Sequence, residues 1–127
     1  MANILICEDD RLIGRIIERK LLEDFHQVKL VENGDIAIRK LKEQVFQLVI
    51  SDVMMPVNSG LDVINYLRNE LRSDIPILVV SALSEEDNIQ EAIKLGASDY
   101  VSKPFSVGAL REKVGYLLKV PHCEPGH

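Results

Sequence analysis

The chain has 127 residues, of which 46% are hydrophobic and 28% charged, and its formal net charge is -5. This length supports one domain with a single hydrophobic core and is too short for two. No apolar run approaches the roughly 20 residues that a transmembrane helix needs, and the acidic balance argues against direct binding to nucleic acid or to an anionic membrane.

Five short apolar runs alternate with five amphipathic segments. The expected strands are 4–7, 28–31, 48–52, 77–81 and 99–101. The segments between and after them carry apolar residues at helical spacing. These are Leu12, Ile13, Ile16, Ile17 and Leu21; Ile36, Ala37, Leu41 and Val45; Leu61, Ile64, Leu67 and Leu71; Ile89, Ala92, Ile93 and Leu95; and Val107, Leu110, Val114, Leu117 and Leu118. Ser84 is expected to cap the fourth helix, and Gly96 to end it.

Strands that alternate with helices predict an α/β domain with a parallel sheet, right-handed crossovers and helices on both faces. We assign residues 1–120 to this domain and residues 121–127, where the composition changes, to a linker or an appended tail. The amino terminus enters an apolar run directly, so no signal peptide is expected. Cys7, in an apolar run, and Cys123, in the tail, do not make a disulfide framework, which favours the reducing cytoplasm.

Acidic residues stand where two of the predicted strands end. Glu8, Asp9 and Asp10 close the first strand, and Asp52 closes the third. Open α/β sheets place their ligand crevices at the carboxyl ends of the strands. If the first and third strands are neighbours, their carboxylates converge and repel one another, and a hard divalent cation such as Mg²⁺ would relieve the repulsion.

A hydroxyl and an ammonium complete the group. Ser81 ends the fourth strand and Lys103 follows the fifth. Phosphoryl transfer to a carboxylate needs a nucleophilic aspartate together with positive groups that offset charge on the phosphoryl oxygens. The set therefore predicts this chemistry at Asp52.

Each of these residues also has an ordinary structural role. One of the three acids is expected to cap the first helix, and Asp52 alone would more often be a cap or turn residue. The Ser81 hydroxyl could bond backbone, Lys103 could be a solvated charge, and Met54 and Met55 could be core residues. Singly the ordinary roles are favoured, but their placement at consecutive strand ends favours function.

The sequence resembles the receiver domains of bacterial two-component response regulators over residues 3–119. Four segments carry the resemblance: ILICEDD (4–10), LVISDVMMP (48–56) with Gly60, ILVVSA (77–82) and GASDYVSKPF (96–105). The resemblance implies a flavodoxin-like, doubly wound five-stranded parallel sheet with strand order 2-1-3-4-5. It also implies that Asp52 is the phosphoacceptor.

The same resemblance assigns roles to the other site residues. Mg²⁺, or Mn²⁺ in its place, would be held by Asp52, by Asp9 directly, by Glu8 through water and by the backbone carbonyl of Met54. Lys103 would pair with the phosphoryl group, and Pro104 would follow a cis peptide bond. Ser81 would hydrogen-bond a phosphoryl oxygen, and Tyr100 would swing between outward and inward rotamers.

A receiver domain is a phosphoacceptor switch in a phosphorelay, and it catalyses only its own phosphorylation and dephosphorylation. The resemblance implies that the donor is a sensor histidine kinase or a phosphotransfer protein. An effector domain or downstream protein would read the switch on the surface of the fourth helix, fifth strand and last helix. A homodimer is a further partner that the resemblance allows.

Two other functions compete with this interpretation. A phosphatase of the haloacid-dehalogenase type also uses a strand-end aspartate, but it places a second Asp two residues later, where this chain has Met54. A receiver-like module could instead bind a partner without being phosphorylated. Such modules usually lack one of the expected site residue types, and all of these types are present here.

Overall fold

The computed structural model describes residues 2–53, 59–82 and 86–119. The expected cap Ser84 and the expected metal ligand Met54 lie outside these ranges. None of the helices within them has the length and hydropathy of a membrane-spanning segment. The elements are β1 (Asn3–Cys7), α1 (Arg11–Glu23), β2 (Gln27–Val31), α2 (Gly34–Glu43), β3 (Leu48–Asp52), α3 (Gly60–Asn65), the π-helical turn η1 (Tyr66–Glu70), β4 (Ile77–Ala82), α4 (Glu86–Leu95), β5 (Asp99–Lys103) and α5 (Val107–Lys119).

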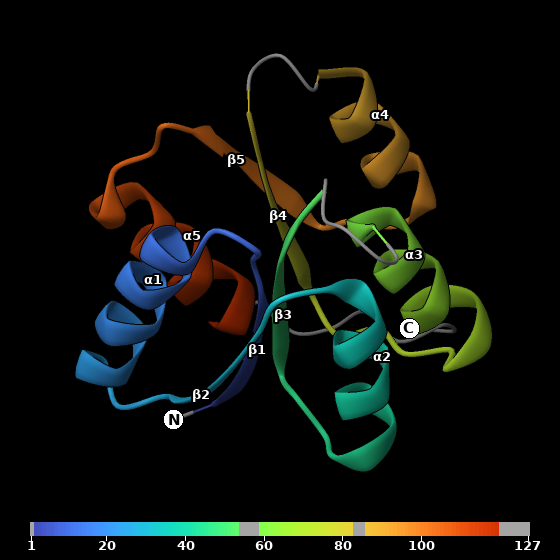
Figure 1. Ribbon diagram of the computed structural model, residues 1–127, viewed down its shortest axis with the longest axis horizontal. Helices are drawn as coiled ribbons and strands as arrows, with labels where there is room; N and C mark the ends of the chain where they lie inside the picture. Colours follow the sequence, from blue (N-terminus) through green and yellow to red (C-terminus); the bar gives the residue numbers. More distant parts are fainter. Residues whose placement is uncertain (1, 54–58, 83–85, 120–127) are drawn as a thin grey trace.

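The five strands form one parallel sheet in the order β2-β1-β3-β4-β5. The predicted fold class and strand order are therefore confirmed. Helices α1 and α5 cover one face of the sheet, and α2, α3 and α4 cover the other (Figure 1). Because β3 lies between β1 and β4, the last residue of β3 stands at the centre of the sheet edge.

Alternation along the strands fills a separate core on each face. Ile4 and Ile6 pack into the cluster under α1 and α5, whereas Leu5 and Cys7 pack into the cluster under α2 and α3. A strand buried on both faces reads as a continuous apolar run, which is why β1 and β3 carry one. Burial raises the pKa of the Cys7 thiol to about 12, so it remains an uncharged core residue.

Three elements differ from the sequence prediction by more than a one-residue shift of a boundary. Helix α2 ends at Glu43, and Val45 beyond it is 75% exposed. The third helix is not continuous, because α3 gives way to the π-helical η1, and Leu71 after it is exposed. Strand β5 runs two residues further than predicted and ends at Lys103. The spacing of apolar residues locates the helical segments. It does not show where a helix ends or where α-helical hydrogen bonding changes to π-helical.

Helix α1 leaves part of its apolar stripe in solvent. Ile17 and Leu21 are buried against the sheet, but Leu12 is 72% exposed and Ile16 is also exposed. Asp10 caps the helix, since its carboxylate accepts hydrogen bonds from the Leu12 and Ile13 amides. One of the three acids is thus a helix cap, as expected. The carboxylates of Glu8 and Asp9 lie in the acidic cluster instead.

The carboxyl end of α1 is closed by an unusual residue. The amides of Phe25 and His26 donate to the carbonyls of Leu22 and Leu21, the pattern that closes a helix through a left-handed residue. That residue is Phe25, with φ 68°, and its side chain is 76% exposed. Glycine is the usual residue at this position because a side chain makes the left-handed conformation unfavourable.

We expect Phe25→Gly to stabilise the fold. The substitution removes the cost of a left-handed side-chain residue, about 1–2 kcal/mol, and part of this gain is offset by the greater freedom of glycine in the unfolded chain. Urea unfolding should show a net gain of about 0.5–1 kcal/mol. Phe25→Ala is the matched control, because it removes the ring but keeps the strain and should give no such gain. Equal stability of the Gly and Ala variants would contradict this explanation.

Candidate functional site

The predicted site residues converge at the carboxyl edge of the sheet. Asp52 is the last residue of β3, and Glu8 follows β1 directly on one side of it. On the other side, Ser81 lies in β4 one residue beyond Val80, the register partner of Asp52. Lys103 ends β5, in register with Ala82. Parallel pairing thus brings residues that are up to 95 positions apart in the chain to one place.

The centre of the site is a lysine shared by two carboxylates. The Lys103 ammonium lies 2.9 Å from Asp52 Oδ2 and 3.2 Å from Glu8 Oε1. Asp52 is 5% exposed and Glu8 is 3% exposed. Charged groups this far from water are stable only when paired, and here one positive charge faces two potential negative charges.

The pKa values reflect this imbalance. Burial first, and then the charge of Asp52, raise the pKa of Glu8 to about 7, although the Asp10 amide and Lys103 act in the opposite direction. Burial is the largest single influence on Lys103 and lowers its pKa. The hydrogen bonds and charges of Asp52 and Glu8 together outweigh burial, so the pKa of Lys103 lies above its ordinary value. The site therefore favours an added positive charge.

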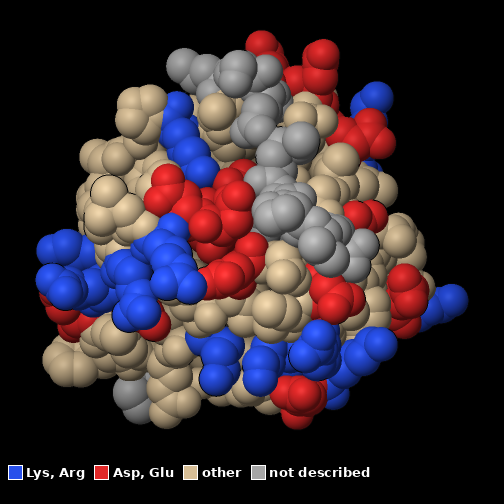
Figure 2. Space-filling view, viewed as in Figure 1, with Lys and Arg blue, Asp and Glu red and all other residues tan. Residues whose placement is uncertain are grey.

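Three carboxylates are close enough to share a cation. Oxygens of Glu8, Asp9 and Asp52 lie within 4.8 Å of one another, and Asp9 is exposed to solvent. Octahedral Mg²⁺ at about 2.1 Å from its ligands brings ligand oxygens to about 3–4 Å from one another, so small side-chain rotations would fit these residues to it. Figure 2 shows acidic side chains gathered near the middle of the molecular surface in the view of Figure 1, with basic side chains beside them over α1.

Two of the other predicted residues differ in exposure. Ser81 is fully buried and its hydroxyl donates to the Ala82 carbonyl at 3.4 Å. Tyr100 is exposed, with its ring 6.0 Å from the Lys113 ammonium. The peptide bond between Lys103 and Pro104 is cis. Ser81 thus lies within the sheet edge, while the Tyr100 ring lies at the surface.

Gly60, which belongs to the segment that carries the family resemblance, supports the site through a close backbone contact that its residue type alone does not predict. Its amide donates to the Val53 carbonyl at 2.9 Å. A Cβ atom added at Gly60 would lie 2.1 Å from the Asp52 carbonyl oxygen and 2.9 Å from Val53 Cα. Only a residue without a side chain lets α3 begin this close to the end of β3. The glycine directly after the capping residue Ser59 was the available signal.

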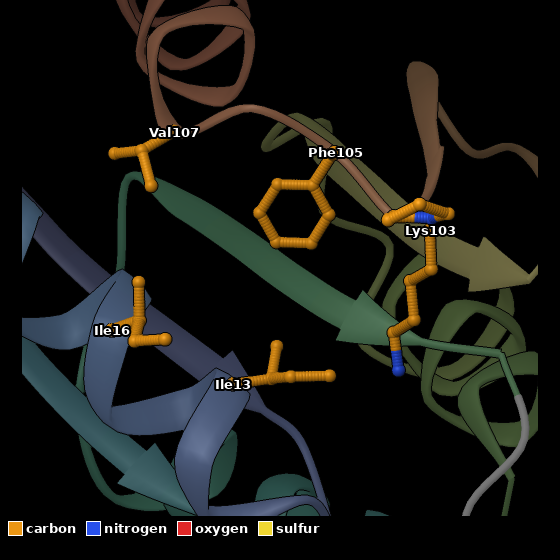
Figure 3. Close-up of a pocket in the computed structure, with 6 residues that line it drawn as sticks. Ile13, Ile16, Lys103, Phe105 and Val107 are labelled. Carbon is orange, nitrogen blue, oxygen red and sulfur yellow. The ribbon is translucent and has the colours of Figure 1, made fainter.

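An apolar groove of about 390 Å³ adjoins the site. Ile13 and Phe105 face each other across it, and the alkyl stem of Lys103 runs along its edge toward the end of β3 (Figure 3). The groove is lined by Ile13, Ile16, Lys103, Pro104, Phe105 and Val107. Lys103 therefore belongs both to this groove and to the acidic cluster.

Residues 4–115 match the family model described as "Response regulator receiver domain". The chain belongs to this family. It is thus a receiver domain of two-component signalling, and the family that its four motif segments resemble is confirmed.

Regulatory proteins and solved receiver domains are similar to this receiver domain along nearly all of its length. The transcriptional regulatory protein KdpE of Staphylococcus aureus is 34% identical over 119 residues, which cover 94% of this chain and 51% of KdpE. The regulatory protein VanRB of Enterococcus faecalis is 36% identical over 117 residues, covering 92% and 52%. This receiver domain spans about half the length of the curated relatives it matches.

Solved structures share the fold closely. The receiver domain of the Francisella response regulator 1452 superimposes with a TM-score of 0.85 at 28% identity, covering 94% of this chain and 98% of that one. The chemotaxis response regulator CheY4 of Vibrio cholerae gives a TM-score of 0.85 at 26% identity, covering 92% and 98%.

We expect Gly60→Ala to destabilise the receiver domain by roughly 1–3 kcal/mol, the usual range for inserting a methyl group where no space exists. The atoms that must move are the backbone of Asp52 and Val53, so the geometry of the acidic cluster should change as well. Urea unfolding measures the loss.

Gly115→Ala is the matched control, because nothing lies within 4 Å of a Cβ atom at that helical position. This control should gain about 0.5–1 kcal/mol from the better helix propensity of alanine. A Gly60→Ala variant as stable as the wild type would show that the β3–α3 connection has space that the structure does not indicate.

Proposed function

We propose that this receiver domain is a phosphoacceptor switch in which Asp52 takes a phosphoryl group in a Mg²⁺-dependent reaction. One observation carries the proposal. The buried carboxylate of Asp52 pairs with the Lys103 ammonium at 2.9 Å and lies beside the carboxylates of Glu8 and Asp9. The donor is a histidine kinase or a phosphotransfer protein, and small acyl phosphates can substitute. The domain catalyses only its own phosphorylation and dephosphorylation.

The reaction is a displacement at phosphorus. An oxygen of Asp52 forms a bond to phosphorus while the bond from phosphorus to the donor's imidazole nitrogen breaks, and the electron pair leaves with the imidazole. Glu8, Asp9, Asp52 and the Met54 carbonyl would hold Mg²⁺, which when bound offsets negative charge on the phosphoryl oxygens. The Lys103 ammonium, now beside Asp52, pairs with the oxygens of the transferred group.

The switch follows from the new charge. A phosphoryl group adds about two negative charges and three acceptor oxygens. The Ser81 hydroxyl donates to one of these oxygens and draws the end of β4 inward, and Tyr100 moves from its exposed position. Phosphorylation therefore biases two conformations that differ on the surface of α4, β5 and α5, where an effector or a second copy reads the state.

Acetyl phosphate tests the proposed chemistry. Incubation with it and Mg²⁺ should add one phosphoryl group to the wild-type protein, as measured by intact mass, and EDTA should prevent the addition. Asp52→Asn should give no adduct, because its amide is not a nucleophile. Asp99→Asn is a matched control, since Asp99 also pairs with a lysine at 2.9 Å, namely Lys113 of α5, and the variant should be labelled like the wild type.

Other outcomes would identify the competing functions. Folded wild-type protein that takes no phosphoryl group under these conditions would point to an interaction module that works without phosphorylation. Turnover of a generic phosphomonoester such as p-nitrophenyl phosphate would point to a phosphatase.

We also propose that the donor protein covers the apolar groove beside Lys103. Asp52 is buried, so a donor side chain must enter the mouth of the site, and the surfaces around that mouth come into contact with the donor. The groove and the exposed Leu12 and Ile16 of α1 form the apolar part of this rim. Removing this apolar surface from water favours such an association.

A substitution in the groove separates donor binding from chemistry. Ile16→Ser should slow phosphoryl transfer from a histidine kinase that phosphorylates the wild-type domain, and should leave labelling by acetyl phosphate unchanged. Val45→Ser is the control, because Val45 is also β-branched, apolar and exposed but lies beyond α2, away from the groove. Time courses with radiolabelled kinase measure the transfer. Equal slowing by both substitutions, or by neither, would contradict binding over the groove.

A further inference from the structure

Arg68 connects two helices on the face of the sheet covered by α2, α3 and α4. It projects from the π-helical η1, and its Nε donates to the Gly96 carbonyl at 3.1 Å. Its Nη1 donates to the Ser73 carbonyl at 2.7 Å. Gly96 lies 28 positions further along the chain, immediately after α4. One guanidinium of η1 thus links the end of α4 to the connection that follows η1.

The end of α4 is shaped to receive this side chain. The Gly96 amide donates to the carbonyls of Ala92 and Ile93, and Gly96 has φ 124°. A Cβ atom at Gly96 would lie 2.8 Å from Arg68 Cγ and 3.0 Å from its Nε. The positive φ favours glycine here, and a side chain at this position would also collide with the Arg68 side chain. A positive charge at the carboxyl end of a helix is also favourable to the helix dipole.

The Arg68 contacts are costly to lose. The side chain is half-buried, and burial lowers the pKa of its guanidinium, with the charge of Asp74 acting in the opposite direction. A guanidinium partly removed from water depends on its remaining hydrogen-bond acceptors. Planar, fixed donors make arginine better suited than lysine to hold two carbonyls at once. The carboxyl end of α4 is therefore firmly attached to its neighbour.

The opposite end of α4 has a different attachment. Glu86, its first residue, follows Ala82, the last residue of β4, after only three intervening residues. Ser81 precedes Ala82 and lies at the edge of the sheet that holds Asp52. The chain therefore joins the end of β4 directly to the amino-terminal turn of α4, and not to its carboxyl end.

We propose that Arg68 fixes the carboxyl end of α4, so that phosphorylation of Asp52 pivots this helix about Gly96 instead of sliding it along the sheet. This inference rests on the proposed function, which supplies the movement of Ser81. Helix α4 then moves most at Glu86 and Asp87 and least at Lys94. The surface that a partner reads changes at the acidic first turn of the helix and stays fixed at its last turn.

Distances between pairs of spin labels test the pivot. With Cys123 changed to Ser and Cys7 buried in the core, a reference label is placed at Arg19→Cys on α1, on the opposite face of the sheet. The second label is placed at Asp87→Cys or at Lys94→Cys, both exposed positions of α4. Pulsed electron resonance distances are recorded before and after acetyl phosphate and Mg²⁺, with intact mass reporting the adduct in the same samples.

The pivot predicts that phosphorylation shifts the Asp87 distance and leaves the Lys94 distance unchanged. In Arg68→Met, phosphorylation should also shift or broaden the Lys94 distance. Arg39→Met is the control, because Arg39 is an exposed arginine that pairs only within α2, with Asp35, among the contacts observed, and it should behave like the wild type. If Arg68→Met does not fold, the two wild-type distances decide the question, and Arg68→Lys tests the loss of the second carbonyl contact.

Equal shifts at both labels in the wild-type background would refute the pivot, as would an Arg68→Met protein with wild-type distances. These results presuppose an adduct on Asp52. A folded protein that forms no adduct would refute the proposed function, and this inference with it, so the mass measurement distinguishes the two failures.

Discussion

Two carboxylates at the centre of a parallel sheet edge share one ammonium group. Lys103 pairs with Asp52 and Glu8, both nearly removed from water, so the site is short of one positive charge when both acids are ionised. A buried imbalance of this kind is unfavourable unless a proton or a cation corrects it. The raised pKa of Glu8 is the proton-based correction, and the neighbouring Asp9 offers a third carboxylate to a cation.

The two faces of the sheet differ in what they connect to this edge. On the α1 and α5 face, the apolar groove begins at the stem of Lys103 and is lined by side chains from α1 and from the start of α5. On the other face, α4 follows β4 and is held at its far end by Arg68. A change of charge at Asp52 can therefore affect both faces of the sheet. Lys103 at the end of β5 lines the groove on one face, and β4, which contains Ser81, leads into α4 on the other.

The sequence predicted the features that depend on residue type and local order. Apolar runs gave the strands, and acidic, hydroxyl and lysine residues at strand ends gave the members of the site, while the strand order came from family resemblance. Features set by distant contacts were not predictable. Arg68 binds a carbonyl 28 residues away, and the π-helical turn that presents it depends on a hydrogen-bond pattern that no residue type marks. Its spacing predicts that Val45 lies on a helix, but α2 ends at Glu43 and the Val45 side chain is 75% exposed.

Lys103 has a further consequence for how this domain can diverge. Its stem forms part of the groove wall while its ammonium pairs with Asp52, so a substitution at this part of the wall also changes the ion pair at Asp52. The other apolar residues of the wall, among them Ile13, Ile16 and Val107, make no ion pair or hydrogen bond with the acidic cluster among the contacts observed. Under the proposed donor binding, substitutions on the α1 side could therefore change which donor is recognised and leave the charges around Asp52 intact.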